Sequence, residues 1–216
     1  RLGIGRGDMM EANGRWSRGL YLCLALTALT ALAGGLGGCA SALIGVGATA
    51  GVAVAQERSI GQAVDDATIL ADINHKLLQR SETLFINVDV EVVEGRVLLT
   101  GNVKLPANRI DVARMAWQAK GVREVLNELE IRDTGSLRDY ATDVWITTQL
   151  KVKFLGDTEI SAINYSIDTL NGVVYLFGIA QSQKELDRAT GHARNVKGVV
   201  KVVSHVILKT DPKRNS

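Results

Sequence analysis

The chain has 216 residues, of which 25 are basic and 23 acidic, and its formal net charge is +2. Residues 1–38 hold four of the basic and two of the acidic residues, so the remaining segment carries 21 of each and is formally neutral. Without a basic excess, the composition gives no support to nucleic-acid binding, and we predict no nucleic-acid partner.

The first 38 residues have the parts of a bacterial secretory signal. Arg15 and Arg18 precede an uncharged, leucine-rich run at 20–33, and small residues follow at 34–38. The tetrapeptide Leu36-Gly37-Gly38-Cys39 is typical of a lipobox, at which Cys39 becomes the acylated first residue of a lipoprotein. We therefore predict a lipoprotein signal peptide at 1–38, with residues upstream of the start codon at its beginning.

An uncleaved membrane anchor is the alternative, because no charged residue occurs between positions 19 and 55. The leucine-rich part has only about 13 residues, which suits a signal peptide better than a membrane span. Cleavage would remove Cys23 and leave no thiol for a disulfide, a nucleophile or a metal site. The Gly/Ala-rich segment 39–63 is expected to be a flexible tether, and a membrane-hugging segment is its alternative.

The strongest internal signal is a duplication at a constant offset of 77 residues. It needs no gap between 66–131 and 143–208, and identical pairs include Asp66 with Asp143, Ile69 with Ile146, Gly95 with Gly172 and Gly101 with Gly178. We predict two copies of one small domain, at 64–132 and 139–209. A linker at 133–138 joins them, and a basic tail follows at 210–216.

Each copy opens with a helical pattern in which apolar residues recur every four positions. They are Ile69, Ile73 and Leu77 in the first copy and Ile146, Leu150 and Phe154 in the second. Apolar residues then alternate with others on both sides of Glu94-Gly95 and of Asn171-Gly172. This alternation predicts two β-hairpins with tight turns.

A second helix is predicted from Pro106 to Lys120, since proline is tolerated in a first helical turn. Gly121 and Gly198 stand where a glycine would end the second helix of each copy. Closing strands are expected at 124–131 and 201–208. Each unit is thus αββαβ, and the fold class is α+β, with two helices covering one face of a small sheet.

These patterns resemble a known family. Each hairpin contains Gly-x-Val-x-Leu-x-Gly, at 95–101 and 172–178, and each second helix is followed by Gly-Val and a strand. The arrangement resembles tandem BON domains (bacterial osmotic-shock and nodulation domains), and with the lipobox it is similar to dual-BON outer-membrane lipoproteins. The resemblance implies a periplasm-facing protein that binds anionic phospholipid through its second BON domain and supports outer-membrane integrity.

The resemblance also points to the first helix of the second copy, from Trp145-Ile146-Thr147-Thr148 onward. The chain departs from the family pattern at Gln149 and Leu150, where a more basic start is usual. The candidate phospholipid-binding residues are Trp145, Thr148, Gln149, Lys151, Val152, Lys153 and Leu155.

The helical repeat turns Trp145 and Val152 away from the core of their own domain. The first copy has Thr68 and His75 at the same positions, so this apolar outward face belongs to the second copy alone. Tryptophan prefers the headgroup level of a bilayer, and basic residues nearby would attract anionic lipid. The alternatives are that Trp145 packs against the first domain or the linker, and that the basic residues form a solvated surface.

The sequence contains no recognisable catalytic or metal-binding pattern. His75, His192 and His205 lie in three different elements, without metal-ligand spacing. The carboxylates Asp65, Asp66 and Asp143 are expected to cap helix starts. We therefore predict no enzyme activity, no metal and no cofactor.

Two other functions stay open, an adaptor for an envelope assembly or peptidoglycan-associated partner and, with less support, an enzyme using Asp66 or His192. Ala40 follows Cys39 where an aspartate would signal retention, so the sorting rule that comes with the resemblance predicts the outer membrane. We expect a monomer.

Overall fold

The computed structural model describes residues 59–132 and 137–215. In chain order the first part contains α3 (Ile60–Arg80), α4 (Glu82–Asn87), β1 (Val88–Val93), β2 (Arg96–Val103), α5 (Pro106–Trp117), β3 (Glu124–Asn127) and β4 (Glu130–Ile131). The second part contains α6 (Leu137–Leu155), η1 (Ala162–Asn164), β5 (Tyr165–Leu170), β6 (Val173–Ala180), α7 (Gln183–Arg194), β7 (Lys201–Leu208) and η2 (Pro212–Asn215). The predicted signal peptide, Cys39 and positions 39–58 of the predicted tether lie outside the described residues, as does most of the predicted linker.

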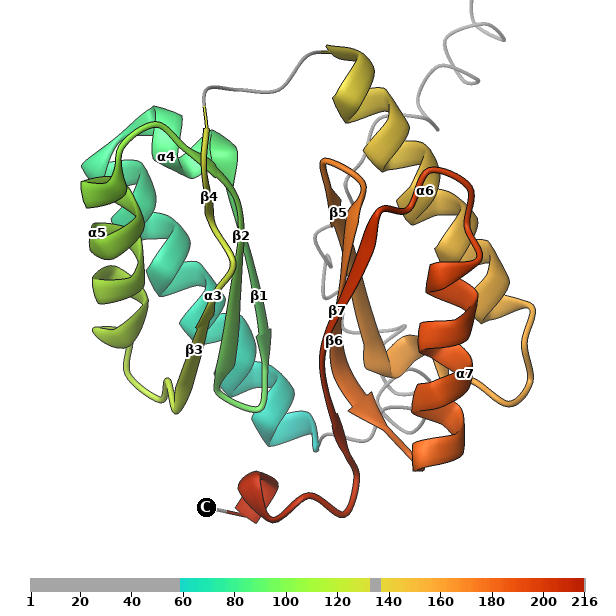
Figure 1. Ribbon diagram of the computed structural model, residues 1–216. Coiled ribbons are helices and arrows are strands. Elements are labelled where there is room, and N and C mark those ends of the chain that lie inside the picture. The colour runs from blue at the N-terminus through green and yellow to red at the C-terminus, as the bar shows by residue number, and fades with distance from the viewer. Residues whose placement is uncertain (1–58, 133–136, 216) are drawn as a thin grey trace, which may run out of the picture. The chain divides into compact units, whose positions relative to one another are not determined.

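Both parts have the same sheet topology. In the first, β2 is central, antiparallel to β1 and parallel to β3 and β4. In the second, β6 is central, antiparallel to β5 and parallel to β7. Figure 1 shows α3 and α5 together on one face of the first sheet, and α6 and α7 together on one face of the second. The predicted α+β fold of two αββαβ units is confirmed.

The apolar stripes of the first helices build the two cores. Ile69, Ile73 and Leu77 of α3 are buried against β2 and α5. Ile146, Leu150 and Phe154 of α6 are buried against β6 and α7 in the same way. Each copy of the repeat therefore has its own hydrophobic core, as expected of a duplicated domain.

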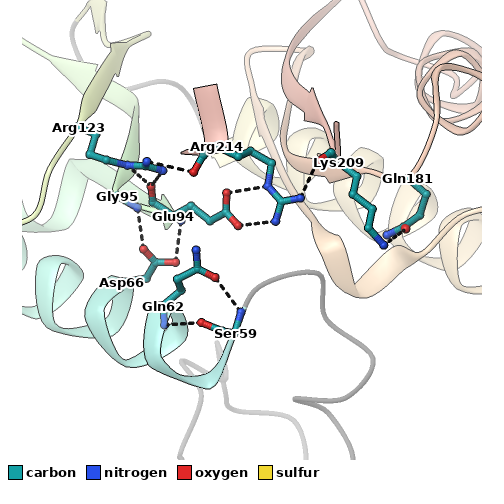
Figure 2. A network of polar contacts seen from close by, with 9 residues as sticks. All are labelled: Ser59, Gln62, Asp66, Glu94, Gly95, Arg123, Gln181, Lys209 and Arg214. Carbon is teal, nitrogen blue, oxygen red and sulfur yellow. Dashed lines mark hydrogen bonds and ion pairs between the residues drawn. The ribbon is translucent and has the colours of Figure 1, made fainter. Parts of the chain in front are cut away.

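The hairpin turns are held by a buried carboxylate from the preceding helix. Both central residues of the first turn, Glu94 and Gly95, have positive φ angles, of 53° and 72°, as a type I′ turn requires. Their backbone N–H groups each donate to Asp66, at 2.8 Å (Figure 2). Asp143 accepts from Asn171 and Gly172 in the second turn.

The prediction that these aspartates cap helix starts is therefore wrong. The helix α3 begins at Ile60, within the segment predicted as tether, so Asp66 lies in its second turn. The true cap is a capping box, in which Ser59 Oγ accepts from Gln62 N and the Gln62 side chain accepts from Ser59 N. Asp143 likewise lies inside α6, which begins at Leu137 within the predicted linker.

Three further predictions about element boundaries need correction. The short helix α4 was not expected, and the first closing strand is divided into β3 and β4, with buried Leu129 between them. The helices α5 and α7 end at Trp117 and Arg194, before the glycines predicted to stop them. Gly121 and Gly198 instead lie against α3 and α6, where an added Cβ would come within 3.3 Å of an isoleucine Cδ1.

The sheet faces that carry no helices also bury side chains. Leu98 of β2 clusters there with Tyr175 and Phe177 of β6. The Arg96 guanidinium lies 5.1 Å from the centre of the Phe177 ring and donates to the His205 carbonyl at 2.9 Å. The αββαβ pattern predicts one covered face for each sheet, yet β2 and β6 are buried on both faces, which agrees with their nearly continuous apolar runs.

Acidic side chains also approach one another between the two sheets. Burial, together with the nearby charges of Asp168 and Glu91, raises the pKa of Asp89 to about 6. Because the pKa of Asp89 in the folded chain lies above the ordinary aspartate value of 3.8, ionised Asp89 destabilises the fold above about pH 6 and no longer does so below about pH 4.

We therefore expect Asp89→Asn to raise the free energy of unfolding at pH 8. Solvent screening limits the gain to less than about 1 kcal/mol, since neighbouring groups cover Asp89 only in part and the residue still contacts solvent. The gain should vanish at pH 4, which urea denaturation at the two pH values would measure. An equal gain at both would show that the charge of Asp89 is not responsible.

Candidate membrane-binding surface

The helix α6 has apolar side chains on two opposite sides. Its inner side is buried in the core, whereas Trp145, Val152 and Leu155 are 47%, 61% and 78% exposed. Their spacing of seven and three residues places them on one side of the helix. Thr148 lies between them, and its hydroxyl donates to the Val144 carbonyl at 2.8 Å. We call Trp145, Thr148, Val152 and Leu155 the outer stripe.

The outer stripe is only partly repeated in the first domain, where Ala71 and the 50% exposed Leu78 match Thr148 and Leu155. At the offset of 77 residues, Trp145 and Val152 correspond to Thr68 and His75, both exposed on α3. Trp145 belongs to none of the buried clusters, and Tyr140, a candidate to cover it, is itself exposed. The structure thus places Trp145 at the surface, as the helical repeat predicts.

Two lysines flank the outer stripe on α6. Lys151 and Lys153 are exposed, and neither has an ion-pair partner among the described residues. In the first domain, the counterpart Lys76 binds Asp72, one turn earlier on α3. The position that matches Asp72 is Gln149, so no carboxylate neutralises Lys153 from that side. The seven residues proposed from the sequence are therefore an exposed apolar stripe, two flanking lysines and the half-buried Gln149.

A shallow hollow, which the sequence patterns do not predict, lies beyond the end of α6. It has a volume of about 420 Å³ and is lined by Lys153, Gly156, Asp157, Thr158, Arg188 and His192. The Arg188 Nε donates to Asp157 Oδ2 at 2.6 Å, and His192 Nε2 lies 2.7 Å from the same oxygen. These two contacts hold the pKa of Asp157 well below its usual range, and the hydrogen bond from Arg188 has the larger effect.

The remaining polar candidates have structural partners. Asp66 and Asp143 hold hairpin turns, His192 contacts Asp157, and His205 Nε2 lies 2.8 Å from Glu128 Oε1. Within 59–132 and 137–215 there is no group of three or more side chains that could hold a metal ion. In the same two segments, none of the helices combines the length and apolar character of a membrane span.

Comparison with known proteins identifies the family. The model of the BON domain matches residues 65–133 and 142–210. An uncharacterized protein in the gshII 5' region of Anaplasma centrale is 47% identical over 147 residues, which is 68% of this chain and 96% of that protein.

Two named relatives share the same segment. The outer membrane lipoprotein DolP of Haemophilus influenzae is 31% identical over 78% of this chain and 87% of its own length. The osmotically-inducible protein Y of Escherichia coli is 30% identical over 69% of this chain and 76% of its own. With both copies of the repeat matched, the chain belongs to the BON-domain family and carries two BON domains in tandem.

Proposed function

We propose that this chain is a lipoprotein of the bacterial envelope, attached to the outer membrane through Cys39 and facing the periplasm. Its second BON domain binds anionic phospholipid with the outer stripe of α6, and this contact supports outer-membrane integrity. The observation that carries the proposal is the exposure of Trp145 and Val152 on a helix whose counterpart in the first domain shows polar residues there. The resemblance to an outer membrane lipoprotein supports the compartment.

The chemistry of α6 suits the edge of a bilayer. Tryptophan is enriched at the headgroup level of bilayers, where its apolar ring and its polar N–H group both have suitable partners. Val152 and Leu155 would leave water with it, and Thr148 adds little cost because its hydroxyl is already bonded to the backbone. Lys151 and Lys153 would each contribute about 1 kcal/mol near an anionic surface.

A weak contact is sufficient if the chain is anchored. Acyl chains on Cys39 would hold the second BON domain close to the bilayer, so that docking becomes an intramolecular step at high effective concentration. The affinity of α6 for lipid would then determine how the second BON domain is oriented at the membrane, whereas the acyl chains would keep the chain bound to it.

The test is quenching of tryptophan fluorescence by brominated acyl chains. The mature chain, acylated at Cys39 and without Trp16 of the predicted signal peptide, is reconstituted in vesicles that contain brominated phospholipid, with either zwitterionic or partly anionic headgroups. We expect quenching of Trp145 in anionic vesicles and its loss in Trp145→Phe. The matched control is Trp117→Phe, which removes an indole of similar exposure, 54%, from α5 and should leave the quenching of Trp145 in place.

Salt separates lipid docking from an adaptor role. Headgroup attraction weakens at high ionic strength, so the quenching should fall as salt is added. Val152→Glu, which keeps the Trp145 indole as the reporter, should abolish the quenching without lowering the melting temperature, because Val152 is 61% exposed and lies outside the core. Quenching that is identical in Trp145→Phe and in the original chain would contradict the proposal, and a salt-insensitive protein partner bound at the stripe would favour the adaptor.

A further inference from the structure

The hollow beyond α6 brings cationic groups together from two helices. Lys153 comes from the last turn of α6, and Arg188 and His192 from successive turns of α7. Thr158 adds an exposed hydroxyl from the connecting loop. Among its lining residues, only Asp157 is acidic, so the hollow combines positive charge with hydrogen-bond donors.

The acidic groups around the hollow are already neutralised. The Asp157 side chain is 7% exposed and accepts a hydrogen bond from Arg188. Glu159 binds Lys184 Nζ at 2.5 Å and Arg188 Nη1 at 2.9 Å. Lys153 therefore keeps its charge for an incoming anion.

The carbonyl groups at the end of α6 do not oppose an anion strongly. A helix C-terminus carries partial negative charge. Here Gly156 N donates to the Val152 carbonyl at 3.0 Å, and Asp157 N to the Phe154 carbonyl at 3.3 Å. These bonds satisfy two of the carbonyl groups at this end of the helix.

The first domain lacks these properties at the equivalent positions. Arg80 and Asp111 stand where the second domain has Asp157 and Arg188, so the ion pair is reversed. Met115 replaces His192, and Lys76 is bound by Asp72. Lys153 without an ion-pair partner, His192 and the ion-paired Arg188 occur together only in the second of the two described domains. They lie at the end of the helix that carries the outer stripe.

We propose that this hollow binds the phosphate group of an anionic phospholipid, with Lys153 and Arg188 as its cationic contacts and the His192 imidazole as a further polar contact. The inference rests on the proposed function, because it places the headgroup beside the apolar stripe. Val152 precedes Gly156 by one helical turn, so Val152 and the hollow are close enough for one lipid molecule to place an acyl chain beside Val152 and its phosphate beside Lys153. Free phosphate shares this chemistry and serves as a separate probe.

The experiment follows backbone amide shifts of the full chain held in phosphatidylcholine nanodiscs. One arm adds phosphatidylglycerol to the disc, and the other adds glycerol phosphate to the solution. We expect shifts around Lys153, Gly156 and Arg188 in the lipid arm, and weaker ones in the free-phosphate arm. The decisive variant is Gln149→Asp, which recreates the Asp72–Lys76 pair beside Lys153 and leaves Lys153, Arg188 and His192 themselves unchanged.

Gln149→Asp should weaken the apparent Kd for phosphatidylglycerol about fivefold, which corresponds to about 1 kcal/mol per cation at an anionic surface. In a Lys153→Gln background the same change should add little, because both act on one charge. The matched control Lys76→Gln, in the first domain, should leave the Kd unchanged.

Several results would overturn the inference. Shifts that persist unchanged in both Gln149→Asp and Lys153→Gln would place the anion elsewhere, and shifts with glycerol phosphate alone would exclude a lipid headgroup. If the hollow responds to neither probe while Trp145 is still quenched, the inference fails and the proposed function stands. Loss of quenching together with a response to glycerol phosphate would instead reject lipid docking.

Discussion

Replacing Gly178 by alanine is expected to destabilise the second BON domain by about 3 kcal/mol or more. Gly178 lies in β6 with a φ of 135°, and an added Cβ would come within 2.0 Å of the Asn164 carbonyl oxygen. That oxygen belongs to the backbone and cannot rotate away. Overpacking costs about 1–3 kcal/mol, and an unfavourable φ adds a further 1–3 kcal/mol, roughly.

The matched control is Gly191→Ala in the same domain. Gly191 lies within α7, and an added Cβ would meet no atom within 4 Å. Alanine there should stabilise the protein by about 0.5–1 kcal/mol, because glycine is a poor helix former. Urea denaturation of the two variants should therefore give changes of opposite sign. A small effect of Gly178→Ala would mean that β5 moves freely away from β6.

The same geometry explains the family motif. Gly101, the counterpart of Gly178, has a φ of 112°, and its Cβ would come within 2.1 Å of the Asn87 carbonyl oxygen. The last glycine of Gly-x-Val-x-Leu-x-Gly is thus a site of close backbone approach rather than a turn. The sequence shows that a glycine recurs at this position, but the reason depends on a strand partner that only the structure identifies.

Local patterns predicted the repeated unit well. Helical spacing located the buried faces of α3 and α6, and Asn171-Gly172 predicted the type I′ turn. The misassigned Asp66 shows the limit of such reasoning, because an acidic residue near an expected helix start was read as its cap. The pattern Ser59-x-x-Gln62 was a better signal for the start, and it would have placed Asp66 inside the helix.

For the candidate site, too, one part could be predicted from local patterns and another part could not. The outward direction of Trp145 follows from the helical period alone, and the structure agrees with it. The hollow could not be predicted, because Arg188 and Asp157 are 31 residues apart and meet only when α7 packs beside α6. The cluster of Leu98 with Phe177 likewise depends on contacts between two sheets.

Removing Arg214 is expected to cost about 3 kcal/mol of unfolding free energy. Arg214 lies in η2, within the segment predicted as a basic tail, and binds Glu94 of the first hairpin turn through two bonds of 2.6 and 2.9 Å (Figure 2). The Glu94 side chain is only 1% exposed. Arg214→Ala would leave this carboxylate buried without its bidentate partner, which typically costs about 3–5 kcal/mol.

A double-mutant cycle tests this assignment. Glu94→Gln removes the charge that Arg214 neutralises, so Arg214→Ala should cost less in that background than alone. The neighbouring Lys213 provides the control, because its 3.8 Å contact with Glu124 is exposed and Lys213→Ala should cost less than about 1 kcal/mol. If the two effects were additive, the bond between Glu94 and Arg214 would contribute nothing. A measured coupling would show that the C-terminal turn stabilises the first BON domain through the charge that Arg214 supplies to Glu94.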